Sequence, residues 1–370
     1  TFAASAFAAP SVTLYGRIDT GLVYTHKNLD NTAGSTDTFS MDSGVTTGSR
    51  WGLKGSEDIG NAKVGFVLES GFNSDDSDDG TSGQNNRLFG REAQVNVSGA
   101  YGTLYAGRLA SIASDAGSIG YLGDVSAFPN GFGIVGTQKG STGTAYDRYD
   151  NTLAYQTPTF GGLQGAIMYS FKGDAKVSDS NPKEVANARE NSGDADRYLA
   201  AGLRYKAGKA AVVLTGDMTM YSNDVNNVYH DVDNGYSFIL GGNYDFGVAK
   251  VFAKATYFDN QVNVIDSFSL IKDARDLKKA EALKGWGAEL GTNVPAFGGN
   301  FLAAVGYRDA KDVDDGSYKF KRWNAAVGYT YAFSKRTSVY AAAGYAQEKS
   351  NAKDRKASAA QAGFGLVHKF

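Results

Sequence analysis

The chain contains 370 residues, with 37 lysines and arginines, 39 aspartates and glutamates, and a formal net charge of -2. This balance supplies no overall basic field for nucleic acid, and the absence of cysteine excludes disulfides, thiolate metal sites and cysteine nucleophiles. No stretch approaches the roughly 18 consecutive apolar residues of a membrane helix, which excludes helical membrane spans.

The first residues resemble the end of a secretory signal peptide. In TFAASAFAAP, Ala6 and Ala8 form an A-x-A arrangement just before Pro10. We expect residues 1–8 to be a remnant of such a peptide and residues 9–370 to form one domain. The alternative is a disordered apolar terminus. Export of a chain without cysteine is typical of the Gram-negative envelope.

Apolar and polar residues alternate from Val12 onward, which is the pattern of a strand with one apolar face. In the first such segment one face carries Val12, Leu14, Ile18, Leu22 and Tyr24, and the other carries Thr13, Tyr15, Arg17 and Asp19. Similar segments recur to the C-terminus and predict about sixteen strands, an even number typical of outer-membrane barrels. The predicted strands are 12–24, 46–57, 62–72, 89–99, 102–108, 151–157, 163–172, 197–206, 209–221, 236–246, 248–258, 283–294, 300–308, 320–333, 337–347 and 358–370.

Short and long breaks alternate between these segments. Residues 58–61, 99–101 and 334–335 are short and rich in turn-forming residues, whereas 26–45 and 73–88 are long. Tyrosine and phenylalanine also lie near many strand ends. Together these features are typical of a barrel with short turns on one side, long external loops on the other and aromatic girdles at both membrane interfaces. A soluble sandwich would share the alternation but would not need the aromatic ends.

The longest break holds about 40 residues rich in glycine, serine, alanine and aspartate, and structureless insertions of that length are usually functional. We therefore predict an all-β fold, a transmembrane antiparallel β-barrel of about 16 strands. Its third external loop, about residues 109–150, is expected to fold into the lumen as a constriction. The last strand ends at Phe370, with Phe364 and Leu366 on the same face, as in the C-terminal signature of outer-membrane barrels.

Five segments, in order, resemble the Gram-negative porins of the neisserial and betaproteobacterial type. They are SVTLYGRIDTG, SRWGLKGSEDIG, LFGREAQVNVSGAYGTLYAGR, RYDNTLAYQTPTFGG and the closing GLVHKF. The resemblance extends over essentially the whole mature chain. It implies a homotrimer of sixteen-stranded barrels in the outer membrane, each a water-filled diffusion channel that the third external loop narrows, and a frequent preference for anions.

Matching SRWG, FGRE and DRYDN to the motifs of that family makes Arg50, Arg91 and Arg148 candidates for a basic cluster on the wall facing the third loop. Arg50 and Lys54 share the polar face of the second strand, and Arg148 has the polar parity of Thr152. Arginines in a narrow pore attract anions and repel cations. Simple alternation places Arg91 on the apolar face, so it requires a bulge or a position above the lipid. The alternative role of all these arginines is to pair with carboxylates and brace the wall.

Acidic residues supply the remaining candidates. Asp115 and Asp124 lie in the inserted loop, where they would face the arginines or make turn hydrogen bonds instead. Asp75, Asp76, Asp78 and Asp79 superficially resemble a calcium loop, but Asn86 stands where a bidentate glutamate is required. We expect a solvated acidic loop there, with a bridging cation to lipopolysaccharide or a neighbouring subunit as the alternative.

The predicted function is passive diffusion of small hydrophilic solutes and ions through an outer-membrane porin with a weak anion preference. A substrate-specific channel is the alternative, but Tyr15, Tyr121 and Phe132 are too scattered to form an aromatic track. A surface β adhesin is a further alternative function. The only histidines are His26, His230 and His368, and no nucleophile motif accompanies them, so we expect neither an enzyme nor a cofactor. The expected partners are two further copies of the chain, outer-membrane lipid and lipopolysaccharide, and the solutes themselves.

Overall fold

The computed structural model describes residues 11–28, 34–76, 87–128, 132, 148–174, 188–225, 231–262, 270, 282–351 and 355–370. The predicted signal-peptide remnant, residues 1–8, lies outside this part of the chain. None of the helices among the described residues is long and apolar enough to cross a membrane.

The described chain consists almost entirely of antiparallel strands joined into one sheet. The strands are β1 (Ser11–Asn28), β2 (Ser35–Ser43), β3 (Arg50–Asp58), β4 (Ala62–Gly71), β5 (Glu92–Gly99), β6 (Gly102–Ala110), β7 (Arg148–Gln156), β8 (Leu163–Ser170), β9 (Arg197–Ala207), β10 (Ala210–Met220), β11 (Gly235–Asp245), β12 (Lys250–Gln261), β13 (Leu283–Ala296), β14 (Gly299–Asp312), β15 (Lys319–Ala332), β16 (Thr337–Ser350) and β17 (Arg355–Lys369). A short 3-10 helix, η2 (Leu122–Asp124), lies between β6 and β7.

The sheet closes on itself because β1 pairs on both of its edges. One edge joins β17 from Arg17↔Lys369 to Asn28↔Ser358. The other edge joins β2 along Thr20–Asn28 and β3 along Ser11–Arg17. Because β2 and β3 occupy successive parts of the same edge, they form one position in the ring, and the barrel has sixteen. The predicted strand number is therefore confirmed.

The second barrel strand differs from its predicted range of 46–57. The predicted loop 26–45 contains the end of β1 and all of β2, and the strand resumes only at Arg50, in β3. The segment STDTFSMDS carries only Phe39 and Met41 as large apolar residues, so its alternation is weak in the sequence. Pairing with β1, a tertiary contact, decides that it forms a strand.

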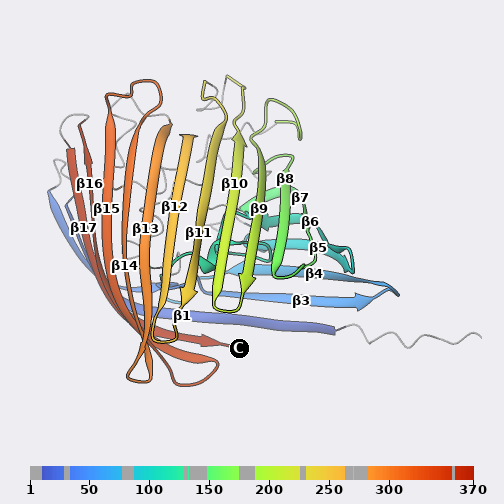
Figure 1. Cartoon of the computed structure of the whole chain (residues 1–370), viewed down its shortest axis with the longest axis horizontal. Helices are drawn as coiled ribbons and strands as arrows, with labels where there is room; N and C mark the ends of the chain where they lie inside the picture. Colours follow the sequence, from blue (N-terminus) through green and yellow to red (C-terminus); the bar gives the residue numbers. More distant parts are fainter. Residues whose placement is uncertain are drawn as a thin grey trace, which may run out of the picture.

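The alternation of short and long connections is confirmed. Pairs such as β5 and β6, β9 and β10, and β13 and β14 are joined by turns of two residues, whereas β6 and β7 are separated by residues 111–147. Among strands β9 to β17 the tight turns lie at the lower end in Figure 1 and the long connections at the upper end. The C-terminus is also at the lower end, where Phe370 and Gly16 exchange two backbone hydrogen bonds of 3.1 Å.

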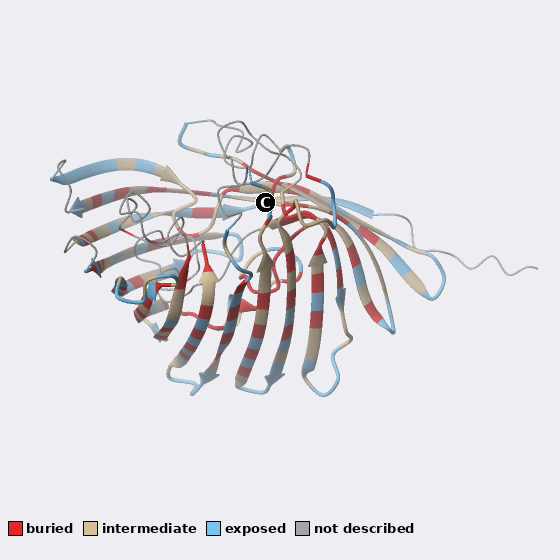
Figure 2. Cartoon of the chain, turned by 90° about the horizontal axis from the view of Figure 1, so that it is seen from above, coloured by how far each residue is buried: buried red, intermediate tan, exposed pale blue. Residues whose placement is uncertain are grey.

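Burial alternates along most strands, such as β9 to β12, as the bands in Figure 2 show. One face, the outer face, exposes large apolar side chains such as Leu203, Leu214 and Leu240, which are 49%, 47% and 56% exposed. The alternate side chains form the inner face and include charged and hydroxyl groups such as Asp19, Thr215 and Asp217. This is the predicted arrangement for a barrel with an apolar surface toward lipid and a polar interior.

Aromatic residues lie near both ends of the outer face. Tyr205, Phe246 and Phe333 lie beside the tight turns, and Tyr257, Trp286 and Trp323 lie toward the long connections; all six are exposed. Amphipathic rings at these two levels are typical of side chains at the two interfaces of a bilayer. Their positions agree with the girdles expected from the sequence.

Replacing Leu240 by arginine should lower the free energy of unfolding by about 2–4 kcal/mol, because a charge in the middle of a lipid-facing barrel surface is poorly solvated. Leu240 is the central outer-face residue of β11. The measurement is urea unfolding of the protein in phospholipid vesicles. As a control, Val248→Arg in the turn after β11, where the side chain is 80% exposed, should cost about 0–1 kcal/mol. Equal losses for the two variants would be inconsistent with a bilayer centred on this face.

Candidate functional site

The segment that follows β6 packs against the inner face of the barrel. Ile112, Ile119, Tyr121, Leu122 and Val125 are at most 2% exposed, so the segment is fixed by its own apolar side chains. Their partners in one cluster include Met168 of β8, Tyr198 of β9, Val213 of β10 and Ile239 of β11. On β9 to β11 these partners alternate with the exposed outer-face leucines, which places the packed segment on the opposite side of the sheet from them.

Phe128 and Phe132 continue the contact to the far part of the ring. They belong to a second cluster that includes Phe252 of β12, Leu302 of β14, Tyr340 of β16 and Val367 of β17. The rings of Phe128 and Phe132 meet edge to face at 5.3 Å, and those of Phe132 and Tyr340 at 6.0 Å. About twenty residues therefore contact the inner faces of strands from β8 to β17.

Polar contacts also hold this segment at fixed points of the wall. Ser111 and Tyr198 share a hydrogen bond of 2.6 Å, and Asn243 donates to the Asp124 carbonyl at 2.7 Å. Asp124 also pairs with Lys206 at 2.5 Å. These contacts lie at separate points of two strands, β9 and β11, and resist movement of the segment in more than one direction.

A buried ion pair lies beneath the end of the segment. Lys254 of β12 and Glu289 of β13 are 3.5 Å apart and are almost completely buried, and Ser126 donates a hydrogen bond to Glu289. A buried charge is tolerated only when it is paired and hydrogen-bonded. The ion pair and the segment that covers it therefore depend on each other.

Four arginines, from β1, β3, β7 and the position just before β5, gather near Glu69 of β4. Arg91 Nε donates to Glu69 Oε1 at 2.7 Å, and Arg50 Nη1 lies 3.7 Å from the same oxygen. The charges of Arg17, Arg91 and Arg148 all act on Arg50. Two carboxylates, Glu69 and its ladder partner Glu92, lie in the same cluster. The structure thus brings together the three arginines predicted from the family motifs.

Simple alternation along the strand does not determine which face Arg91 and Arg148 lie on. Arg91 precedes the first residue of β5, so it is outside the ladder in which alternation would turn it outward. Arg148 does lie in β7, but Asn151 has a φ of 48° and the register with β6 shifts there. Counting from Arg148 to Thr152 crosses this bulge, and parity is not preserved across a bulge.

The other predicted site residues have separate partners. The Lys54 ammonium lies 5.2 Å from the centre of the Tyr15 ring. Asp124, expected to face the arginines, instead pairs with Lys206 at the end of β9, and the charge of Asp115 acts on Lys254. The two aspartates of the segment after β6 are therefore near lysines of β9 and β12.

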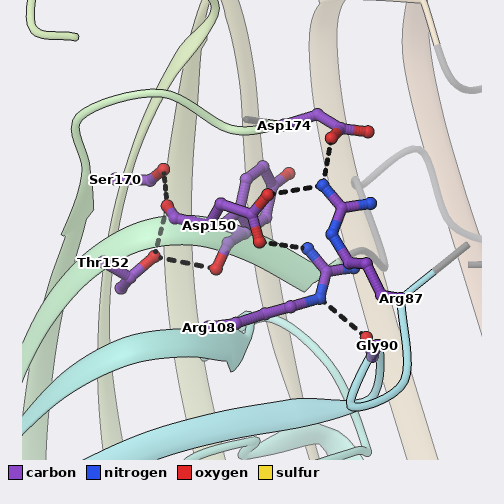
Figure 3. A network of polar contacts seen from close by, with 8 residues as sticks. Arg87, Gly90, Arg108, Asp150, Thr152, Ser170 and Asp174 are labelled. Carbon is purple, nitrogen blue, oxygen red and sulfur yellow. Dashed lines mark hydrogen bonds and ion pairs between the residues drawn. The ribbon is translucent and has the colours of Figure 1, made fainter. Parts of the chain in front are cut away.

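A second ionic network, which the sequence analysis missed, joins the bases of three long connections (Figure 3). Asp150 accepts from Arg87 at 2.6 Å and from Arg108 at 2.7 Å. Arg87 also pairs with Asp174, and Arg108 donates to the Gly90 carbonyl at 2.7 Å. These arginines brace the wall, which is the role considered as the alternative for the motif arginines. The sequence contains no local signal for pairs separated by 42 to 87 residues.

The acidic stretch and the histidines are the remaining candidates from the sequence. Asp78 and Asp79 lie outside the described residues, and no group of metal-binding side chains occurs among those that are described, which include Asp75 and Asp76. His26 Nδ1 is 2.8 Å from Asp37 across the exposed β1–β2 pair. His230 also lies outside the described residues, and His368 contacts Thr337 at 2.9 Å.

Comparisons with known proteins agree with the barrel fold. The family model described as Gram-negative porin matches residues 1–351. An outer membrane porin protein of Bordetella pertussis is 35% identical over 100% of this chain and 97% of its own length. The major outer membrane protein P.IB of Neisseria gonorrhoeae is 29% identical over 98% of this chain and 95% of its own.

The fold is also that of a solved porin. The anion-selective porin from Comamonas acidovorans has a TM-score of 0.65 and 24% identity, covering 98% of this chain and 100% of that one. Sixteen strand positions, an apolar outer face and a family match over nearly the whole length lead to the same conclusion. The chain belongs to the Gram-negative porin family and is an outer-membrane β-barrel that forms a channel for passive diffusion.

Proposed function

We propose that residues 111–128 lie inside the lumen and form its constriction, and that the arginines around Arg50 line the passage left open. The observation that carries this proposal is the contact of one short segment with strands from β8 to β17. In a closed ring of sixteen positions, a segment outside the barrel would not reach the inner faces of so many strands. Permeation is then limited by size at the level of this segment.

Charge at the constriction supports a preference for small anions. An ion that passes a guanidinium at a few ångströms in a medium of intermediate dielectric interacts with it by a few kcal/mol. Charges farther away are screened within about 8 Å at physiological salt. The arginines beside Arg50 therefore count for more than the net charge of -2 of the whole chain. The solved porin from Comamonas acidovorans is itself described as anion-selective.

A substrate-specific channel is less well supported. Tyr121 and Phe132, two of the three aromatic residues weighed for a track, are only 0% and 4% exposed. They hold the loop segment against the wall and present no ring surface along a passage. We therefore assign the chain to general diffusion of small hydrophilic solutes, and we attribute the His26–Asp37 pair to the stability of the β1–β2 hairpin, with no enzymatic role.

Deleting residues 114–128 should raise single-channel conductance severalfold in planar bilayers, because the segment would no longer occupy the lumen. The larger solutes admitted by the deletion variant are measured by liposome swelling with a series of sugars. Circular dichroism of the β-sheet provides the control for assembly. Unchanged conductance in a correctly folded barrel would show that the segment does not set the size of the pore.

Replacing Arg50 and Arg148 together by glutamine should shift the reversal potential in a salt gradient toward cations. A loss of about 1 kcal/mol of anion stabilisation corresponds to a severalfold fall in the anion-to-cation permeability ratio. The matched control is Arg336→Gln, in the exposed turn between β15 and β16, and its effect should be small. A second control neutralises Asp75 and Asp76. An equal or larger shift from either control would contradict the assignment of Arg50 and Arg148 to the constriction.

We also propose that the barrels assemble as trimers in the outer membrane, in contact with lipid and lipopolysaccharide. The support is the family membership, together with the apolar outer face, which requires lipid or another barrel as its neighbour. Detergent-extracted protein is expected to migrate as a trimer that heating dissociates to monomers. A monodisperse monomer in mild detergent, with intact sheet structure, is the result that contradicts this expectation.

A further inference from the structure

Six residues between β2 and β3 leave the ladder and form a turn on the inner face. This 44–49 turn, residues 44 to 49, interrupts a barrel position whose two halves both pair with β1. Gly44 has a φ of 70°, a backbone conformation that favours glycine, and its amide donates to the Asp19 carbonyl at 2.8 Å. The turn therefore begins directly against Asp19.

The Asp19 carboxylate fastens the turn to β1. Its Oδ2 accepts hydrogen bonds from the Thr46 amide at 2.8 Å, the Thr46 hydroxyl at 2.6 Å and the Thr47 amide at 2.9 Å. Its Oδ1 accepts from the Tyr340 hydroxyl at 2.8 Å. Asp19 is 0% exposed. Hydrogen bonds to a charged group are stronger than neutral ones, so four of them on one buried carboxylate make a firm attachment.

The same carboxylate connects the turn to the end of the loop segment. Tyr340, which donates to Asp19, also contacts the ring of Phe132, and Val45 of the turn packs against the cluster that contains both rings. Gly21 of β1, Tyr340 and Val45 are closely packed, since a Cβ at Gly21 would lie 2.6 Å from the Tyr340 hydroxyl and 3.2 Å from Val45. The turn and the loop segment thus meet on the inner face.

At its other end the turn holds Arg50. Arg50 Nε donates to the Gly48 carbonyl at 2.9 Å, and Nη2 donates to the Thr47 hydroxyl at 2.7 Å. Both acceptors belong to the turn, and Thr47 is itself held by Asp19 through its amide. The direction of the Arg50 guanidinium is therefore set by a segment that Asp19 fixes in place.

We propose that the 44–49 turn is a second constriction element, borne by the wall, and that Asp19 is a positioning residue for ion selectivity. Asp19 holds the turn against the end of the loop segment, and the turn presents the Arg50 guanidinium to passing anions. The proposal rests on the proposed function in its use of Arg50. The attachment of the turn itself does not depend on the selectivity of the channel.

The attachment is tested with a single reporter cysteine, because the chain has none of its own. Val45→Cys is made alone and together with Asp19→Asn, and the rate of modification by a water-soluble methanethiosulfonate reagent is measured. Asp19→Asn should raise that rate at least about tenfold, since it weakens several hydrogen bonds to a charged group. Thr103→Cys, on β6, provides the control, and its rate should not change with Asp19→Asn.

Selectivity is tested in planar bilayers with variants that separate the two roles. Asp19→Asn should move the reversal potential toward the value measured for Arg50→Gln. Its effect on single-channel conductance should be smaller than that of deleting residues 114–128. Thr47→Ala removes the side-chain acceptor of Arg50 Nη2 and keeps the amide that binds Asp19. It should shift the reversal potential in the same direction while leaving the Val45→Cys rate unchanged.

The outcomes distinguish this proposal from the proposed function. Unchanged Val45→Cys reactivity in a folded Asp19→Asn barrel overturns the attachment. The positioning role of Asp19 is overturned if Asp19→Asn raises the Val45→Cys modification rate but leaves the reversal potential unchanged, while Arg50→Gln does change the reversal potential. If Arg50→Gln itself has no effect, the proposed anion selectivity fails, and the positioning role fails with it. Should Asp19→Asn not fold, Thr46→Val removes only the 2.6 Å hydroxyl contact and is expected to raise the Val45→Cys rate severalfold; an unchanged rate contradicts the attachment.

Discussion

The pairing of backbone hydrogen bonds around a closed ring is the constraint on which the rest of the structure depends. In a bilayer no water is available to an unpaired amide or carbonyl, so a sheet with a free edge is not stable there. β1 meets this requirement with its two edges, joining β17 on one side and β2 and β3 on the other. Closure then sorts every strand residue to the outer or the inner face.

The segment after β6 packs through its own apolar residues against inner-face side chains of the wall, and Ser126 of that segment contacts the buried Lys254–Glu289 pair. Burial of these charges is tolerated because Lys254 and Glu289 are paired and Ser126 donates a hydrogen bond to Glu289. Packing of the segment and burial of charge therefore form one cooperative arrangement.

The arginine cluster differs from the Lys254–Glu289 pair because its charged side chains are not completely buried. Arg50 and Arg91 share Glu69, and their side chains are 16% and 12% exposed, so they keep some contact with solvent. Backbone and hydroxyl acceptors in the 44–49 turn direct Arg50 without neutralising it. The buried Arg308, in contrast, is paired with the carboxylate of Glu348 at 3.1 Å.

Several features were determined by the sequence alone, because they depend on neighbours in the chain. Period-two alternation established the inner and outer faces, as the exposure of Leu14, Ile18 and Tyr24 and the burial of Asp19 confirm. Turn-forming residues marked the tight connections. The resemblance to the porin family, and not the local pattern, suggested that Arg50, Arg91 and Arg148 lie near one another.

Other features were decided only by the tertiary structure, because they depend on residues far apart in the chain. The weak segment STDTFSMDS is a strand because β1 lies beside it. A bulge at Asn151 makes parity counting unsafe near Arg148. The partner of Asp124 is Lys206, and Arg87 meets Asp150 and Asp174 across three connections. Local pattern specifies which way a side chain points along a strand, but closure of the ring determines what it meets there.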